Sequence, residues 1–526
     1  MKDVKQTVVI PKEKFEFASQ GDMVHDKKLQ TKPVGYFKDA FRRFCKNKGA
    51  VVAAIVVIFL VLFAIFGPLC INSNYTDAYV TDADVKLYKY LSPKLFENGN
   101  FWSGTQKKTA VNESDYYQDL AMGQERGCTT ISDFIKQYEV SDVFSTSIKY
   151  DYRVDAYQTI GAFTKTLTTE QYQALMTWQD ENRIQVILPS VDRNATSKTE
   201  NIWYKCQMKG NAYTTKPEFD ENGDFIPAYR TYASADGRRD DYTSNMRLAK
   251  DPYVNGDTEN GWSYATRTGS ADKGYNYVVR VNPYNYFIYR YGFEPKFTFG
   301  TDASGYDIFT RLASGARFSM LLAVGISAIN LAIGAIYGAI EGFYGGKTDL
   351  IMERVSDILS AIPTMIVVIL FNLHFSATVG AVPALIWAFI VTGWIGMAGT
   401  TRMQFYRYKN QEYVLAARTL GAKDRRLIWK HIFPNALGTL ITSSVLVIPG
   451  VIFSETSLSY LGIINLDSPT RSSVGAMLSA GNGMMTKYPF LVLFPALFIG
   501  LLMVSFNLFG NGLRDAFNPN LRGTEG

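Results

Sequence analysis

Uncharged stretches divide the chain into long apolar segments separated by polar ones. Runs without Asp, Glu, Lys or Arg cover residues 49–76, 318–340, 358–401, 431–454 and 488–513. A helix needs about 20 apolar residues to cross a bilayer, so four runs fit one crossing each and the longest run fits two. The pattern predicts an all-α transmembrane core, and it excludes soluble, secreted, fibrous and disordered classes. The six expected spans are about 49–70, 318–341, 358–374, 381–401, 436–456 and 488–510.

The segment before the first run has its own pattern. Phe37, Phe41 and Phe44 recur at helical spacing within YFKDAFRRFCKNKGA, and basic residues fill the other faces. We predict an amphipathic helix that lies in the lipid headgroup region and leads into the first span, together covering 36–72. A plain basic flank of that span is the alternative. Residues 1–35 are polar and are expected to form a cytoplasmic tail. No cleavable signal peptide is expected, because the first apolar run is too long and starts too late.

A large polar region separates the first span from the second. It is rich in tyrosine, carries frequent Asn-Gly and Asp-Gly turn signals, and contains TLTTEQYQALMTWQDENR, a helix pattern capped by Thr168 or Thr169. The strand pattern IQVIL follows it. We therefore predict that 73–296 form a folded α+β domain inserted between spans 1 and 2.

Charge fixes the expected orientation. Residues 71–300 hold 26 Lys and Arg against 30 Asp and Glu, a net charge of −4. The rest of the chain carries a net charge of +10, which gives the total of +6. Loops on the cytoplasmic side of a membrane are enriched in Lys and Arg, so both termini, including 516–526, and the basic segment 402–430 are expected inside the cell. The domain 73–296 is then extracytoplasmic. The charge excess indicates a bilayer rather than nucleic acid as partner.

Reactive side chains are sparse. Cys128 and Cys206 both fall in the predicted outer domain and could form a disulfide or remain free thiols. The three histidines lack ligand spacing, so no metal site is expected. GGKT at 345–348 lacks the earlier glycine of a phosphate loop and follows a span rather than a strand, so no nucleotide or other cofactor is expected. No catalytic cluster is recognisable, which argues against an enzyme.

The most informative segment is EYVLAARTLGAKDRRLIWKHIFPN, residues 412–435. The pattern predicts a short helix, a break at Gly421, a second basic helix, and Pro434 at the start of span five. Ala416 and Ala417 present almost no side chain, so another protein could pack close to this backbone. An ordinary positively charged loop would not need this Ala-Ala-x-x-x-Gly spacing.

This segment resembles the EAA loop of permease subunits in bacterial binding-protein-dependent ABC importers, within them the C-type subunit for oligopeptides or dipeptides. Four further stretches resemble that family in the right order: 43–57, FGTDASGYDIFTRLASGARFSMLLAVG at 299–325, ETSLSYLGI at 455–463, and NLFGNGLRDAFNP at 507–519. The sequence departs from the family pattern at Tyr306, Asn511, Asn518 and 468–474, and in its long first loop. The departures bear on substrate and docking details, not on the class.

The resemblance implies a type I ABC importer permease fold, with a permease core at 297–515. It also implies a second homologous permease, two cytoplasmic ATPase subunits and an extracytoplasmic peptide-binding protein as partners. Contact with one ATPase would fall to Glu412, Ala416, Ala417, Arg418, Gly421 and Pro434. The family signature before span two would comprise Gly300, Thr301, Asp302, Gly305, Asp307, Arg311, Gly315 and Arg317.

Four questions stay open from sequence. An ionisable residue in a span is by default functional, so Glu455 is a candidate pathway residue, with an interfacial carboxylate reaching for water as the alternative. The substrate could be a peptide or another small solute such as nickel or glutathione. A membrane-anchored extracellular sensor or adhesion module is a reading from a different class, but it leaves the EAA match unexplained. The insert itself is expected to guide the peptide-binding protein or to shield the core.

Overall fold

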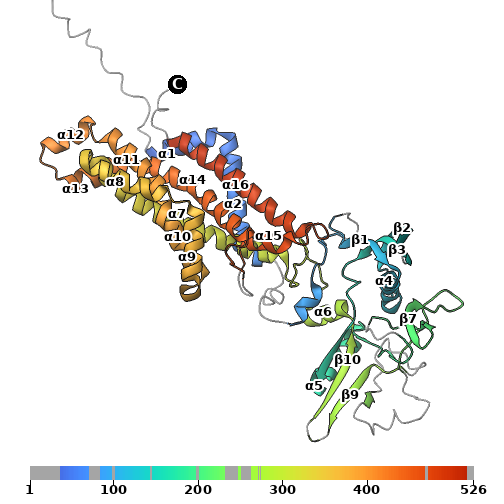
Figure 1. Cartoon of the computed structure of the whole chain (residues 1–526). Helices are drawn as coiled ribbons and strands as arrows, with labels where there is room; N and C mark the ends of the chain where they lie inside the picture. Colours follow the sequence, from blue (N-terminus) through green and yellow to red (C-terminus); the bar gives the residue numbers. More distant parts are fainter. Residues whose placement is uncertain are drawn as a thin grey trace, which may run out of the picture.

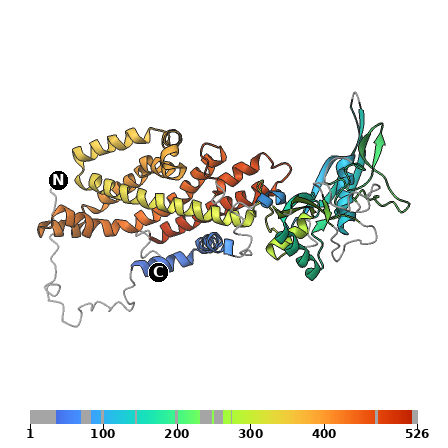
Figure 2. The ribbon, with the colours of Figure 1, turned by 90° about the horizontal axis from the view of Figure 1, so that it is seen from below.

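The computed structural model describes residues 36–69, 83–96, 101–142, 145–196, 201–230, 247–249, 262–270, 272, 274–467 and 472–517. The predicted tail 1–35, Asn518 and residues 468–471 lie outside this part. Figure 1 shows a long helix bundle joined at one end to a domain that contains the sheets. We call that end of the bundle the domain end. The opposite end, where α12 lies, is the loop end (Figures 1 and 2).

Long apolar helices form the bundle. Five helical stretches among the described residues are long and apolar enough to cross a membrane, and α8 with α9 adds a sixth if that bent pair counts as one. The predicted multi-span, all-α core is therefore confirmed, with a count of five to six. The helices are α1 (Tyr36–Lys46), α2 (Lys48–Phe66), α7 (Ile308–Tyr344), α8 (Gly346–Ser360), α9 (Thr364–Val379), α10 (Ala381–Gly393), α11 (Ile395–Tyr408), α12 (Glu412–Thr419), α13 (Asp424–Arg426), the π-helix η5 (Leu427–Ile432), α14 (Phe433–Tyr460), α15 (Val474–Asn482) and α16 (Phe490–Phe517).

The third predicted span differs from expectation. The uncharged run places it at about 358–374, but α9 alone has 16 residues, and α8 before it is bent by 70° relative to α9. The break falls at Ala361–Pro363, where proline cannot continue the preceding helix. His374, the expected end of this span, lies inside α9, and the helix ends at Gly380.

Close approach between α7 and α11 shapes the bundle interior. A Cβ atom at Gly338 would stand 2.1 Å from the Ala398 carbonyl oxygen, so only glycine permits this contact. Lipid is as apolar as the side chains of a membrane helix, so the hydrophobic effect does not drive such helices together. Their association depends on close packing, which small residues at the crossing permit. Nearer the start of α7, a large apolar cluster joins α2, α7, α10, α14 and α16.

The second part of the molecule carries three sheets. β1, β3 and β2 pair in that order, β4, β10, β9 and β8 form a longer sheet with β5 on β10, and β6 with β7 makes a hairpin. This agrees with the predicted α+β domain between the first two spans. Its strands are β1 (Thr105–Asn112), β2 (Ile131–Asp142), β3 (Ser145–Asp155), β4 (Phe163–Thr168), β5 (Ile187–Leu188), β6 (Cys206–Lys209), β7 (Ala212–Pro217), β8 (Arg247–Ala249), β9 (Ala265–Ser270) and β10 (Gly274–Val281).

Helices of the domain follow local sequence signals. α5 (Thr169–Asn182) begins after Thr168, which accepts from the Gln171 amide while Gln171 reaches back, a complete capping box. The predicted helix and the strand after it are thus confirmed. α4 (Glu113–Arg126) packs on the β1–β3–β2 sheet. α6 (Pro283–Tyr291) lies near the junction with the bundle (Figure 1).

The domain is joined to the bundle through direct packing. The Leu91 amide donates to the Thr301 hydroxyl at 2.8 Å, and the Trp102 indole donates to the Thr298 carbonyl at 2.9 Å. Tyr90 stacks on Tyr488 with ring centroids 4.5 Å apart. The segment of the domain before β1 is thus held against the segment before α7 and the start of α16.

Two expectations need correction or refinement. Cys128 and Cys206 are free thiols, so the disulfide that the sequence left open is not formed; Cys206 instead lies buried beside the Thr196 hydroxyl at 3.2 Å. The predicted amphipathic helix exists as α1. However, Phe44 packs edge-on against Phe509 of α16, while Phe41 stays exposed, so the apolar face is shared between the bundle and its surroundings.

Candidate functional site

The predicted coupling segment 412–435 forms the loop end of the bundle. α12 follows α11 after a three-residue break, and Val414 is fully buried in an apolar cluster with Phe343, Phe405 and Leu427. Val414 thus anchors the short helix, and Ala417 is half-buried in the same cluster. Arg418, one turn after Val414, is exposed but lies over the Phe343 ring, 5.8 Å from its centre. The opposite side of α12 is open, where Glu412 and Ala416 are exposed.

Gly421 ends the segment after α12 in a left-handed backbone conformation. Its φ is +84°, and its amide donates to the Arg418 carbonyl at 3.0 Å, which closes the helix end. No described atom lies within 4 Å of the position a Cβ would take. The preceding Leu420 is 88% exposed. The combination gives a small, apolar and accessible surface around 416–421.

Pro434 lies in the first turn of α14, where the sequence places the start of the next span, but the helical stretch that contains it begins earlier. A continuous helical stretch runs from Asp424 to Tyr460, and Pro434 sits at the first turn of α14 directly after the π-helical η5. A wider π turn before the proline accommodates its missing amide hydrogen and its ring. The segment after Gly421 is therefore part of the same continuous helical stretch that enters the interior of the bundle.

An ion cluster beside this segment ties α8 to α11. The Arg402 guanidinium donates to Asp349 at 2.7 and 2.9 Å and to Glu353 at 2.8 and 3.0 Å, and it lies 3.6 Å from Glu341. The Tyr406 hydroxyl donates to Asp349 at 2.6 Å. Sequence reasoning missed this cluster. Its signal was the single arginine that ends the 44-residue uncharged run.

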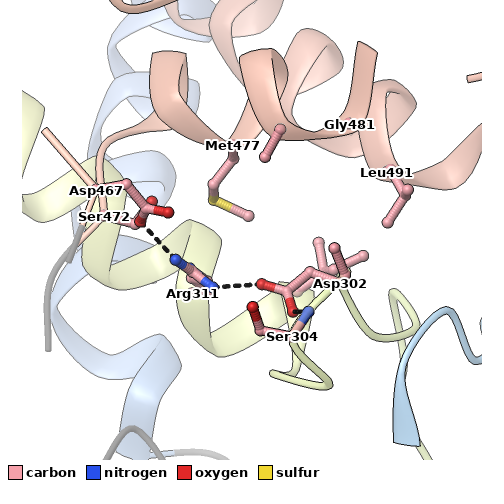
Figure 3. A pocket seen from close by; sticks show the side chains of 11 residues that line it. Asp302, Ser304, Arg311, Asp467, Ser472, Met477, Gly481 and Leu491 are labelled. Carbon is pink, nitrogen blue, oxygen red and sulfur yellow. Dashed lines mark hydrogen bonds and ion pairs between the residues drawn. The ribbon is translucent and has the colours of Figure 1, made fainter. Parts of the chain in front are cut away.

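The predicted signature 300–317 lies at the domain end, around a small pocket of about 60 Å³ (Figure 3). Arg311 from the first turns of α7 is the centre of this site. Its guanidinium donates to Asp302 and, at 2.5 Å, to Asp467, which follows α14. It also lies 5.1 Å from the centre of the Tyr306 ring, the position where the sequence departs from the family pattern. An adjoining open pocket of about 550 Å³ shares Ser304, Arg311 and Asp467.

The remaining signature residues mostly build the backbone of this site. Thr301 is fully buried and bridges Tyr88 and Leu91 of the domain. Asp307 caps α7: its carboxylate accepts from the Thr310 amide at 2.8 Å and the Thr310 hydroxyl at 2.6 Å. Gly315 contacts the Ser472–Val474 backbone. By contrast, Arg317 is exposed on α7 and is not brought into the pocket.

Burial sets the protonation of the two aspartates before α7. Desolvation raises the pKa of Asp307 to about 6 although Thr310 donates to it. Desolvation also raises the pKa of Asp302, against the opposing effect of Arg311. Arg311 therefore offsets part of the burial cost of Asp302.

Glu455 is not an interfacial carboxylate. It is 1% exposed, within α14, and it accepts from the Ser319 hydroxyl of α7 at 2.9 Å and the Ser459 hydroxyl at 3.1 Å. The alternative of a carboxylate reaching for water is thus wrong. Inside this chain Glu455 joins α7 to α14. Ser319 and Asp467 were missed from sequence, because only the fold brings them to these partners.

Comparison with known proteins places the chain in a family. Residues 312–523 match the family described as "Binding-protein-dependent transport system inner membrane component", and residues 35–93 match "N-terminal TM domain of oligopeptide transport permease C". The chain therefore belongs to the family of binding-protein-dependent transport system inner membrane components. Such proteins are multi-pass permease components and not enzymes, in agreement with the sequence-based expectation.

Individual relatives show which members of this family the chain is similar to. The oligopeptide transport system permease protein OppC of Bacillus subtilis (strain 168) is 47% identical over 224 residues, which cover 43% of this chain and 72% of that protein. The dipeptide transport system permease protein DppC of the same organism is 42% identical over 225 residues, 43% of this chain and 69% of that protein. A solved structure of the MetNI methionine ABC transporter aligns with 14% identity and a TM-score of 0.34, over 40% of this chain and 96% of the other.

The two family matches leave residues 94–311 uncovered. This interval contains nearly the whole sheet-containing domain and the signature up to Arg311. The family assignment therefore rests on the bundle, and the domain has to be interpreted from its own structure.

Proposed function

We propose that this chain is a permease subunit of an ABC importer for oligopeptides or dipeptides. The observation that carries the proposal is its 47% and 42% identity to permeases of an oligopeptide and a dipeptide transport system. In this function the chain forms the translocation pathway together with a second, homologous permease. It binds no nucleotide and catalyses no reaction.

Two cytoplasmic ATPase subunits supply the energy in this proposal, and one of them binds the segment 412–435. Support comes from the open surface around Ala416, Leu420 and Gly421, where small and apolar side chains permit close backbone approach. α12 is anchored through Val414, so force applied to it passes to α7 and α11. The helix then continues from Asp424 into the bundle, which couples nucleotide-driven motion to alternating access.

The proposed orientation places the loop end in the cytoplasm and the domain outside the cell, with both termini cytoplasmic. The structure supports it in one respect: the basic segment and the mildly acidic domain lie at opposite ends of the bundle (Figure 2). A peptide-binding protein would deliver substrate at the domain end, beside the Arg311 pocket.

The test replaces Gly421 with Asp. No described atom crowds the site, and aspartate tolerates a left-handed backbone better than most residues, so the chain should still insert. The added charged side chain blocks close approach of the ATPase, and we expect peptide uptake and ATPase co-purification to be lost.

Gly210 supplies a matched control. It also has positive φ and open surroundings, but it lies in the β6–β7 turn of the domain. Gly210→Asp should therefore leave uptake unchanged. Normal uptake by a well-expressed Gly421→Asp variant would contradict the proposed coupling.

A further inference from the structure

The strand β1 has one unpaired edge within the described part of the chain. Its sheet has the order β1–β3–β2, so β3 covers only one side of β1. The Ala156 amide, just after β3, donates to the Gly104 carbonyl at 3.0 Å. Backbone groups alternate in direction along an antiparallel strand, so Gln106 and Lys108 face β3 as well. Lys107 therefore turns its amide and its carbonyl away from the sheet.

A pocket of about 760 Å³ follows this edge. It is lined by every residue from 105 to 112. Side chains alternate between the two faces of a strand, so a pocket that touches all of these residues must lie along the backbone edge. The opposite wall is 486–490, at the start of α16, and Figure 1 shows β1 beside this end of the bundle. The volume is that of a small-molecule site, whereas a folded partner protein needs a much larger surface.

The open edge is bounded at both ends. Before β1, Lys94 forms an antiparallel bridge with Ser103, so this side of the chain already accepts an extended partner up to that residue. After Lys108 the register shifts, and Ala110 has a φ of +53°. The regular open part, from Thr105 to Lys108, spans about 13 Å at about 3.3 Å per residue. This length matches an extended peptide of about four residues.

The pocket also offers charged groups of both signs. Lys107, Lys487 and Asp115 line it and are exposed, and none of them forms an ion pair with another described residue. Lys108, which also lines the pocket, is by contrast bound to Asp119 at 2.5 Å. Two ammonium groups and one carboxylate are complementary to the terminal carboxylate and the terminal amine of a short peptide.

We propose that β1 binds a short peptide in an extended conformation as an added antiparallel strand. Main-chain hydrogen bonds then supply affinity without reading the side chains of the peptide. The aromatic rings of Phe101 and Tyr488 in the lining give side chains of different shapes an apolar contact. Such a site suits peptides of varied sequence. The choice of a transported peptide as occupant rests on the proposed function, whereas the strand addition rests on the geometry of this edge.

Calorimetric titration of the full-length chain in lipid nanodiscs, without ATPase or transport, tests the proposal. The probes are tetraalanine and its analogue methylated at each backbone amide. The analogue keeps both charged termini and all side chains but cannot donate main-chain hydrogen bonds. We expect the analogue to bind at least about tenfold more weakly than tetraalanine.

A proline at Lys107 removes the outward amide while leaving the bonds to β3, because proline is tolerated on the open side of an edge strand. Lys107→Pro should bind tetraalanine at least about tenfold more weakly than Lys107→Ala, which loses the same charge but keeps the amide. Gln137→Pro is the control on β2, the other edge strand. Gln137 lies opposite Tyr150, whose backbone faces β1 by the same alternation, so this proline also replaces an outward amide. It should leave binding unchanged.

Several results would overturn the proposal. Equal affinity for the two probes would exclude strand addition. Equal binding by Lys107→Pro and Lys107→Ala would place the peptide elsewhere in the chain. No binding of tetraalanine, with affinity for the peptide-binding protein lowered only in Lys107→Pro, would assign this edge to that protein instead. A chain that binds tetraalanine as expected but supports no uptake with its partners would refute the proposed function and leave the edge site standing.

Discussion

Asp307 illustrates what a single buried carboxylate does at a helix start. Its pKa is about 6 in the folded chain against 3.8 ordinarily, because burial disfavours the charge. The folded state therefore holds the proton more tightly than the unfolded state. Stability is then highest below about pH 4 with respect to this group and falls as the pH rises through about 6.

Asp307→Asn removes that titration while keeping an oxygen that can cap α7. We expect the variant to gain stability relative to the wild type as the pH rises from 4 to 7, by at most about 3 kcal/mol. Unfolding in detergent at several pH values measures this difference. A constant difference between the two proteins across that range would show that Asp307 does not titrate as its burial indicates.

Sequence reasoning found most single residues of the candidate sites but not their partners. The resemblance singled out Arg311 and Asp302, and the glycine break at Gly421 predicted a helix end. Asp467 was not predicted, because it lies 156 residues from Arg311 and only the fold joins them. The burial of Glu455 was equally hidden, since an apolar run does not reveal which helix face meets another helix.

At the scale of helices and strands, α8 shows what a search for apolar runs misses. It carries charged residues at Lys347, Asp349, Glu353, Arg354 and Asp357, so a search for uncharged runs passes over it. Asp349 and Glu353 are paired with Arg402 of α11, which no pattern within α8 could reveal. The other spans were predictable because their uncharged runs overlap their helices, although the ends differ by up to about ten residues.

Arg402→Ala should loosen α8 from α11. Loss of the guanidinium leaves Asp349, Glu353 and Glu341 close together without their cation, at an expected cost of about 2–3 kcal/mol. Thermal unfolding reports the cost, and faster amide exchange confined to α8 reports the loosening.

Arg354→Ala is the matched control on the same helix. Its ion pair with Asp357 is exposed on both sides, so its loss should cost about 0.5 kcal/mol or less. Equal effects of the two substitutions would show that the Arg402 cluster does not hold α8 in place.

At the scale of the whole molecule, the sheet-containing domain is the feature that distinguishes this chain. Its position at one end of the bundle followed from the order of apolar runs, and its α+β character from turn signals and one capped helix. Its contacts with the bundle could not be predicted, because the sequence does not show that two distant aromatic residues such as Tyr90 and Tyr488 will pack together.

Replacing residues 105–281 with a long flexible linker tests what the domain contributes. This change keeps Tyr90, Leu91 and Trp102, which pack on the bundle. If the domain guides the peptide-binding protein, the shortened permease should assemble with its ATPases, and its apparent affinity for the loaded binding protein should fall at least about tenfold. Unchanged affinity would leave shielding of the core as the role of the domain.

The stacked junction has a mechanical consequence. Because Tyr90 rests on Tyr488 and Leu91 is bonded to Thr301, a tilt at the start of α16 or α7 must turn the whole domain with it. In Figure 2 the β2–β3 hairpin extends away from that junction, so a small rotation of the domain becomes a larger displacement at the outer ends of β2 and β3. A pair of fluorescent labels, one on this hairpin and one on the bundle, would therefore report a tilt of α7 or α16 as a change in distance.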